Sequence, residues 1–139
     1  MRAATRLPRY LALAYGLLVA YACLHPFSGW QPNGLPLFDF LWAPWPRYYR
    51  GLDIVLNVLG FLPLGFLLAA ASPVRWPRLL VVLLTFLGAS LLSLSLETLQ
   101  NFLPTRVASN LDLGANAIGA LVGVILGVIG GRRLFAEGG

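Results

Sequence analysis

Lysine is absent from this chain of 139 residues, and charged residues of every kind are scarce. Charged residues make up 11% of the sequence and hydrophobic residues 58%, and the mean hydropathy is +0.77. A soluble domain carries about 25% charged residues, so this chain cannot cover a water-facing surface. We expect an integral membrane protein, with residues 1–139 forming one transmembrane domain. The short tails and loops that remain exclude a separate nucleotide-binding, zinc-finger or DNA-reading domain.

Cysteine and histidine each occur once, as Cys23 and His25. A single cysteine cannot form a disulfide within the chain. One cysteine and one histidine cannot build an ordinary zinc site either. We therefore expect no cofactor, and the alternative left open is a Ca²⁺ or Mg²⁺ ion held by the carboxylate oxygens of Asp53, Glu97 and Asp112.

Long apolar runs dominate the sequence and predict an all-α membrane protein, a bundle of four transmembrane helices. The runs are approximately Tyr10–Leu24, Leu52–Ala71, Leu79–Leu99 and Leu111–Gly130. All ten basic residues are arginines, and they lie near the ends of these runs. We attribute the net charge of +5 to topology and lipid headgroups, and expect no nucleic-acid partner.

The distribution of arginines predicts the orientation of the chain. If the N-terminus is cytoplasmic, seven of the ten arginines fall on the cytoplasmic side and three (Arg47, Arg50 and Arg106) on the outer side. Both termini are then cytoplasmic. A basic start followed by Ala20-Tyr-Ala-Cys23 also fits a cleaved lipoprotein signal. The residues before the cysteine match a lipoprotein box poorly, which favours a retained first span.

The connection between the first two spans, residues 25–51, is rich in proline and aromatic residues. Trp and Tyr favour the headgroup level of a bilayer. We expect Leu35–Trp42 to lie along the outer interface as a short helix or re-entrant turn. A sharper alternative is that this loop forms a lid over whatever the bundle holds there.

A short polar motif occurs twice, once in the second span and once in the fourth. It reads Asp53-x3-Asn57-x2-Gly60 and then Asp112-x3-Asn116-x2-Gly119. Residues at i, i+4 and i+7 share one face of a helix. The second and fourth spans both run into the membrane from its outer side, so the two motifs should lie at similar depth in parallel helices. Duplicated helix hairpins would explain the repeat, and chance is the alternative.

The third span brings further polar groups to the same level from the opposite direction. Glu97 and Gln100 lie in its last turn, and Arg106 follows in the next loop. A carboxylate near the bilayer centre costs about 2.5–3.5 kcal/mol, so such groups should face the bundle interior and pair. We expect Arg106 to hold one carboxylate in a bidentate pair. Seven residues form the predicted polar pocket: Asp53, Asn57, Glu97, Gln100, Arg106, Asp112 and Asn116.

Each acidic residue also has a local interpretation. Ser109-x2-Asp112 resembles a capping box, and Asp53 at a helix start would suit the helix dipole. Capping does not explain Asn57 one turn deeper in the membrane. It also does not explain Glu97 at a helix C-terminus, where the dipole disfavours a carboxylate.

Glycines recur every four residues in the fourth span, at Gly119, Gly123 and Gly127. Small residues at this spacing let helix backbones approach closely. We expect the stripe to serve packing inside the bundle, and a homodimer interface is the alternative.

These residues together resemble the VanZ-like family of membrane proteins. The resemblance covers about residues 53–127 and rests on a set of spaced motifs. They are Asp53-x3-Asn57, Phe61-x-Pro63-x-Gly65, Glu97-x2-Gln100, Arg106, Asp112-x3-Asn116 and Gly119. The resemblance implies a small multi-pass protein of the bacterial cytoplasmic membrane and cell envelope. It also implies a connection with resistance to the glycopeptide antibiotic teicoplanin, with which the founding member of the family is associated.

Three hypotheses about function follow. In the leading one, the outer pocket binds the headgroup of a membrane lipid, such as a lipid-linked cell-wall precursor. In the second, the chain is an intramembrane hydrolase or transferase, in which a buried carboxylate acts as general base on a lipid-linked substrate. In the third, it is a structural accessory subunit whose polar cluster fixes helix register. Catalytic residues are not assigned.

Overall fold

A computed structural model describes residues 2–44, 51–104 and 106–138. Its long helices are α1 (Arg2–Leu24), α3 (Gly51–Ala71), α4 (Arg78–Gln100) and α5 (Asn110–Leu126). A short helix, α2 (Asp39–Trp42), lies in the connection of residues 25–51, which we call the aromatic loop. Helix α5 continues through the π-helical turn η1 (Gly127–Gly131) into α6 (Arg132–Gly138). The protein is all-helical in the described residues, as the apolar runs predict.

Four of these helical segments are long and apolar enough to cross a membrane. They are Arg6–Leu24, Gly51–Ala71, Arg78–Gln100 and Asn110–Phe135. The leucines that point away from the bundle, such as Leu13, Leu17 and Leu87, are more than half exposed. In water this surface would be unfavourable, but it suits contact with lipid chains. The chain is therefore a multi-pass membrane protein.

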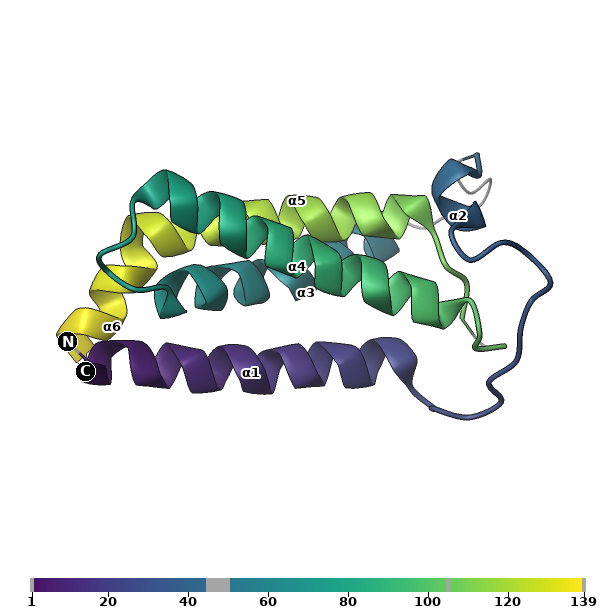
Figure 1. Ribbon diagram of the computed structural model, residues 1–139, viewed down its shortest axis with the longest axis horizontal. Helices are drawn as coiled ribbons and strands as arrows, with labels where there is room; N and C mark the ends of the chain where they lie inside the picture. Colours follow the sequence, from purple (N-terminus) through teal and green to yellow (C-terminus); the bar gives the residue numbers. More distant parts are fainter. Residues whose placement is uncertain (1, 45–50, 105, 139) are drawn as a thin grey trace.

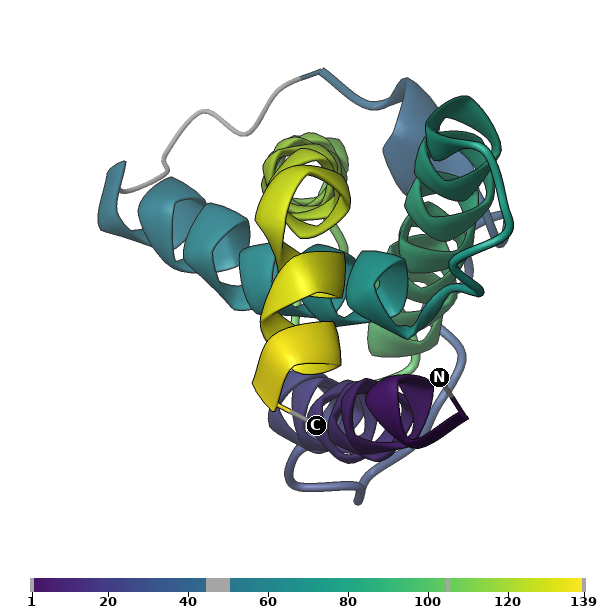
Figure 2. The same ribbon diagram turned by 90° about the vertical axis from the view of Figure 1, so that its left-hand side faces the viewer.

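The helices form an elongated bundle whose two ends differ in the segments that lie there (Figure 1). α1 starts and α6 ends at the same end of the bundle, which we call the terminal end (Figure 1). The aromatic loop and the α4–α5 connection lie at the opposite end, which we call the chamber end (Figure 1). Seen from the terminal end, α6 turns away from the line of α5 and reaches α1 (Figure 2).

Helix α5 packs most extensively on α3, along the glycine stripe. A Cβ atom at Gly119 would overlap the carbonyl oxygen of Val58, and one at Gly123 would overlap that of Leu62. Residue numbers rise together on the two helices, so α3 and α5 are parallel, as the repeated motif predicts. We call this contact the glycine seam.

The glycine seam answers the question of what the stripe packs against. Gly119, Gly123 and Gly127 all face α3 of the same chain, where backbone and Cβ atoms fill the space beside them. This contact supports packing inside the bundle as the role of the stripe, and the homodimer through these three glycines stays a prediction. A second copy could reach them only if α3 first left the bundle.

Arginine side chains close the terminal end of the bundle. The Arg132 guanidinium donates to the carbonyl oxygens of Pro73 and Trp76, just after α3 ends. Arg9 donates from Nε to the carbonyl oxygen of Ala71 at 3.4 Å. Cations near a helix C-terminus satisfy carbonyl groups that have no partner within the helix.

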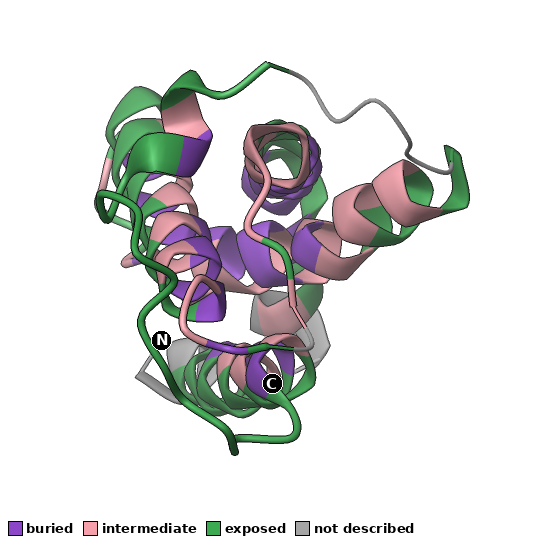
Figure 3. Ribbon diagram, turned by 90° about the vertical axis from the view of Figure 1, so that its right-hand side faces the viewer, coloured by how far each residue is buried: buried purple, intermediate pink, exposed green. Residues whose placement is uncertain are grey.

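The aromatic loop lies on the α4–α5 connection. Gln31 N donates to the carbonyl oxygen of Phe102 at 2.8 Å, and Asn101 Nδ2 donates to that of Leu37 at 3.0 Å. Seen from the chamber end, this loop is exposed over most of its length (Figure 3). The short helix expected over Leu35–Trp42 forms only over Asp39–Trp42, as α2. Trp45, Tyr48 and Tyr49, with Arg47 and Arg50, lie outside the described residues.

Candidate functional site

A cavity of about 650 Å³ opens at the chamber end, and we call it the chamber. The ends of α1, α3, α4 and α5 surround it, together with residues 106–109 of the connection. Six of the seven predicted pocket residues line it: Asp53, Asn57, Glu97, Gln100, Arg106 and Asp112. Side chains from three spans and a loop are thus brought to one place.

The Glu97 side chain is only 4% exposed, and its position has a clear physical reason. The backbone N–H of Ser109 donates to Glu97 Oε2 at 3.1 Å. Although Glu97 lies at the C-terminal end of α4, the fold places it at the start of α5. A carboxylate is favourable beside a helix N-terminus, where backbone N–H groups lack partners. The C-terminal end of the α4 dipole disfavours the Glu97 carboxylate, and the N-terminal end of α5 beside it compensates for that cost.

The capping residue of α5 leaves the Asp112 carboxylate available to the chamber. The Ser109 hydroxyl oxygen accepts from the backbone N–H groups of Leu111 at 3.2 Å and Asp112 at 3.4 Å. In a capping box, the acidic side chain would turn back to the N–H of the cap residue. Glu97 occupies that N–H here. Asp112 instead accepts a hydrogen bond from Asn57 Nδ2 at 3.0 Å.

Gln100 and Arg106 hold the end of α1 against the chamber. Gln100 Nε2 donates to the carbonyl oxygen of Cys23 at 2.9 Å. Arg106 Nη2 donates to the carbonyl oxygens of Ala22 at 2.9 Å and His25 at 3.0 Å, and Nε also donates to His25 at 3.1 Å. The predicted bidentate pair with a carboxylate is therefore wrong for the described residues. The last carbonyl groups of α1 compete for the guanidinium instead.

Asn116 is the predicted residue that does not line the chamber. It is 3% exposed, and its Nδ2 donates to the hydroxyl oxygen of Ser93 at 2.9 Å. Within the described part of the chain, the Oδ1 atom of Asn116 is buried without a hydrogen-bond partner. Asn116 thus links α5 to α4 inside the bundle.

The acidic residues of the chamber do not form a metal site within the described ranges. There, no three His, Cys, Asp or Glu side chains lie close enough together to hold a metal ion. The considered set of oxygen ligands from Asp53, Glu97 and Asp112 is therefore not assembled.

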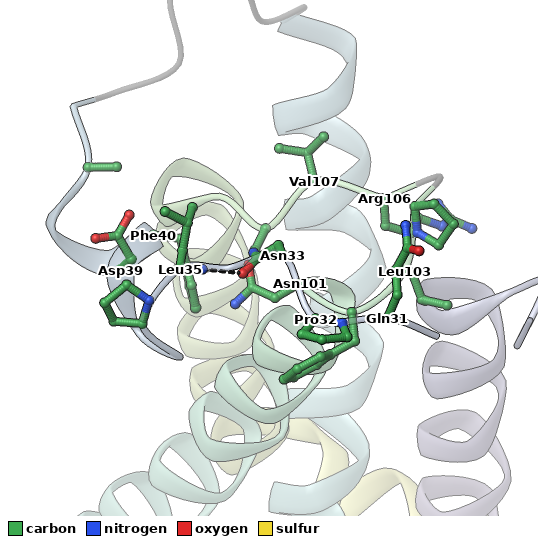
Figure 4. Close-up of a pocket in the computed structure, with 15 residues that line it drawn as sticks. Gln31, Pro32, Asn33, Leu35, Asp39, Phe40, Asn101, Leu103, Arg106 and Val107 are labelled. Carbon is green, nitrogen blue, oxygen red and sulfur yellow. Dashed lines mark hydrogen bonds between the residues drawn. The ribbon is translucent and has the colours of Figure 1, made fainter. Parts of the chain in front are cut away.

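A second cavity, of about 400 Å³, lies between the aromatic loop and the α4–α5 connection (Figure 4). Arg106 and Val107 border both cavities and separate them. Asn33 Oδ1 accepts from the backbone N–H of Leu35 at 2.9 Å there, which stiffens the loop (Figure 4). Among the described residues, several of 25–44 line this second cavity and none of 25–44 lines the chamber, and the lid over the chamber stays a prediction.

Some contributors to the chamber carry no signal in the sequence. The carbonyl groups of Ala22, Cys23 and His25 hold the two long polar side chains, but any residue type has a carbonyl group. Ser109 could be recognised, because serine before a helix is a typical cap.

The family comparison covers most of the chain. The model of the family described as VanZ/LLP1 matches residues 11–131. The chain belongs to the VanZ/LLP1 family. The VanZ/LLP1 match extends beyond the motifs at 53–127 and includes α1 from residue 11 and the aromatic loop, for which the sequence offered no motif. No curated protein and no solved structure matches the chain.

Proposed function

We propose that the chamber binds the headgroup of a membrane lipid. The observation that carries the proposal is the convergence of six polar side chains on one cavity at the end of a membrane bundle. Ionisable residues within membrane spans usually mark functional sites, because their insertion is costly. The depth suits a headgroup, since the chamber lies where the helices end.

The excess of arginines at the terminal end supports an extracytoplasmic chamber. Arg9 and Arg132 lie at the terminal end, on the same side as Arg75 in the α3–α4 connection and Arg78 at the start of α4. Positively charged residues accumulate on the cytoplasmic side of membrane proteins. In this orientation, both termini are cytoplasmic and the chamber faces the outer leaflet.

The hydrogen-bonding character of the chamber favours a headgroup that carries donors. Asp53, Glu97 and Asp112 present carboxylate oxygens, which are acceptors when ionised. The donors of Gln100 and Arg106 described above are directed to backbone carbonyl groups. A primary amine or sugar hydroxyl groups would complement such a site. Phosphoethanolamine lipids and lipid-linked cell-wall precursors both carry these groups.

The proposal is tested by lipid retention, measured by native mass spectrometry of the purified protein. Phosphatidylethanolamine and phosphatidylcholine differ in whether the nitrogen carries N–H donors. We expect the purified protein to retain phosphatidylethanolamine and to lose phosphatidylcholine. The Asp112→Asn and Glu97→Gln variants should each bind phosphatidylethanolamine about 10- to 150-fold more weakly, because a hydrogen bond to a charged group contributes about 1.5–3 kcal/mol. Both replacements keep an acceptor oxygen, so the fold should survive.

The matched control is Asp39→Asn, which removes a carboxylate that lines the other cavity. This variant should retain phosphatidylethanolamine as well as the wild-type protein does. Equal retention of both lipids, or full retention by Asp112→Asn, would contradict the proposal. A lipid-linked disaccharide–peptide precursor is the second probe in the same assay. Its conversion to a product that depends on Glu97 would instead favour the enzyme hypothesis.

A role in teicoplanin resistance is part of the proposal that rests on family membership alone. If headgroup binding underlies it, cells expressing the chain should tolerate more teicoplanin than cells expressing Asp112→Asn at the same membrane level.

A further inference from the structure

A third cavity, of about 270 Å³, runs between α1 and α3 and adjoins the chamber. The two cavities share four lining residues: Ala22, Cys23, Leu56 and Asn57. The remaining walls are mainly apolar, with Leu18, Val19 and Phe61 among them. We call this cavity the α1–α3 groove. It continues from the chamber into the depth of the membrane.

The groove is open because its lining residues are small at the right places. Apart from the adjacent residues and the backbone of its own helix, no heavy atom lies within 4 Å of a Cβ atom built on Gly60. At the deep end, the hydroxyl group of Tyr15 donates to the carbonyl oxygen of Gly60. The hydroxyl proton of Tyr15 therefore already has a hydrogen-bond partner and needs none from a ligand in the groove. From Ala22 to Tyr15 the groove follows α1 for about 10 Å, given a rise of 1.5 Å per residue.

The junction between chamber and groove lies at Asn57. Its amide donates to Asp112 on the chamber side, while the same residue lines the groove. A polar cavity that continues into an apolar one at membrane depth suits an amphipathic lipid, which has a polar headgroup and apolar chains. We propose that the α1–α3 groove holds a hydrocarbon chain of the lipid whose headgroup lies in the chamber. This inference rests on the proposed function and narrows its ligand to a chain-bearing amphiphile.

A larger apolar cavity, of about 540 Å³, does not compete for this role. It lies elsewhere on α1 and is lined by residues such as Leu13, Leu68 and Leu92. It shares no lining residue with the chamber. A chain in that cavity would have no route to the polar groups, so it would not select for a headgroup.

The test is photocrosslinking with a phosphatidylethanolamine that carries a diazirine in one acyl chain. For the wild-type protein, we expect crosslinks to concentrate on residues 15–23 of α1 and 56–61 of α3. Gly60→Leu fills the groove and should reduce these crosslinks about tenfold, since a filled site excludes the chain by direct overlap. Gly114→Leu is the matched control, because Gly114 is exposed and a Cβ atom there would meet open space. Gly114 lines neither the chamber, nor the α1–α3 groove, nor the larger apolar cavity.

The outcomes separate this inference from the proposed function. Water-soluble glycerophosphoethanolamine, which has no acyl chain, should bind wild type and Gly60→Leu equally. If it binds both but crosslinks are spread evenly over the lipid-facing surface, the groove inference is wrong and the chamber proposal stands. If it binds neither and wild-type protein shows no concentrated crosslinks, both are wrong. The wild-type crosslink map decides the groove inference even if Gly60→Leu does not fold.

Discussion

Asn57 and Asn116 hold the same place in two copies of one motif, yet their surroundings differ. Asn57 is half-buried and donates to Asp112 at the chamber, whereas Asn116 is 3% exposed and donates to Ser93 inside the bundle. The glycines of the two copies differ as well, since Gly60 faces open space and Gly119 lies against Val58. The aspartates of both copies line the chamber, but the asparagine and glycine of the α3 copy border cavities, whereas those of the α5 copy pack inside the bundle.

The difference between the copies comes from their neighbours. The copy on α3 borders the α1–α3 groove, where Asn57 lines the cavity and Gly60 has open space beside it. The copy on α5 lies between α3 and α4, so its small and polar residues meet backbone and side chains on both sides. A repeated motif therefore positions residues at one depth, and the packing around each helix decides what they do.

The glycine positions should show the largest contrast. Gly119→Ala places a Cβ on the Val58 carbonyl oxygen and should destabilise the protein by about 1–3 kcal/mol, as overpacking does. Gly60→Ala meets open space and should be neutral or slightly stabilising, because alanine has the better helix propensity. Thermal unfolding in detergent measures both. Similar losses for the two variants would contradict the contrast.

The asparagine positions should show a smaller contrast in stability and a clear one in binding. Asn116→Ala removes a buried hydrogen bond to Ser93 and should destabilise the protein by about 1 kcal/mol. Asn57→Ala should leave stability almost unchanged but weaken phosphatidylethanolamine retention, since it lines the chamber. Thermal unfolding combined with native mass spectrometry separates these effects. A binding loss confined to Asn116→Ala would reverse the assignment.

The sequence predicts the spans and the chamber well because both follow from the cost of placing groups in lipid. Apolar runs long enough to cross a bilayer have few other folds available. Glu97 and Asp112 are costly in a membrane span, so their convergence on an interior cavity could be expected. The glycine spacing likewise indicates close helix contact, although it cannot say whether the partner is α3 or a second copy.

The partners of individual side chains could not be predicted. Arg106 was expected to bind a carboxylate, but backbone carbonyl groups at the end of α1 take its donors. Glu97 was expected to be unfavourable at a helix end, but α5 begins beside it. Both outcomes depend on which helix ends meet at the chamber. Spacing along one helix contains no information about that.

Cys23 offers the most direct test of the chamber, because it is the only cysteine in the chain and lines the cavity. The measurement is the rate at which a water-soluble maleimide labels Cys23 in lipid nanodiscs. We predict that labelling proceeds in phosphatidylcholine and slows several-fold when phosphatidylethanolamine is added, because the bound headgroup then covers the thiol. No labelling in either lipid, or the same rate in both, would contradict a water-accessible chamber that binds a donor-bearing headgroup.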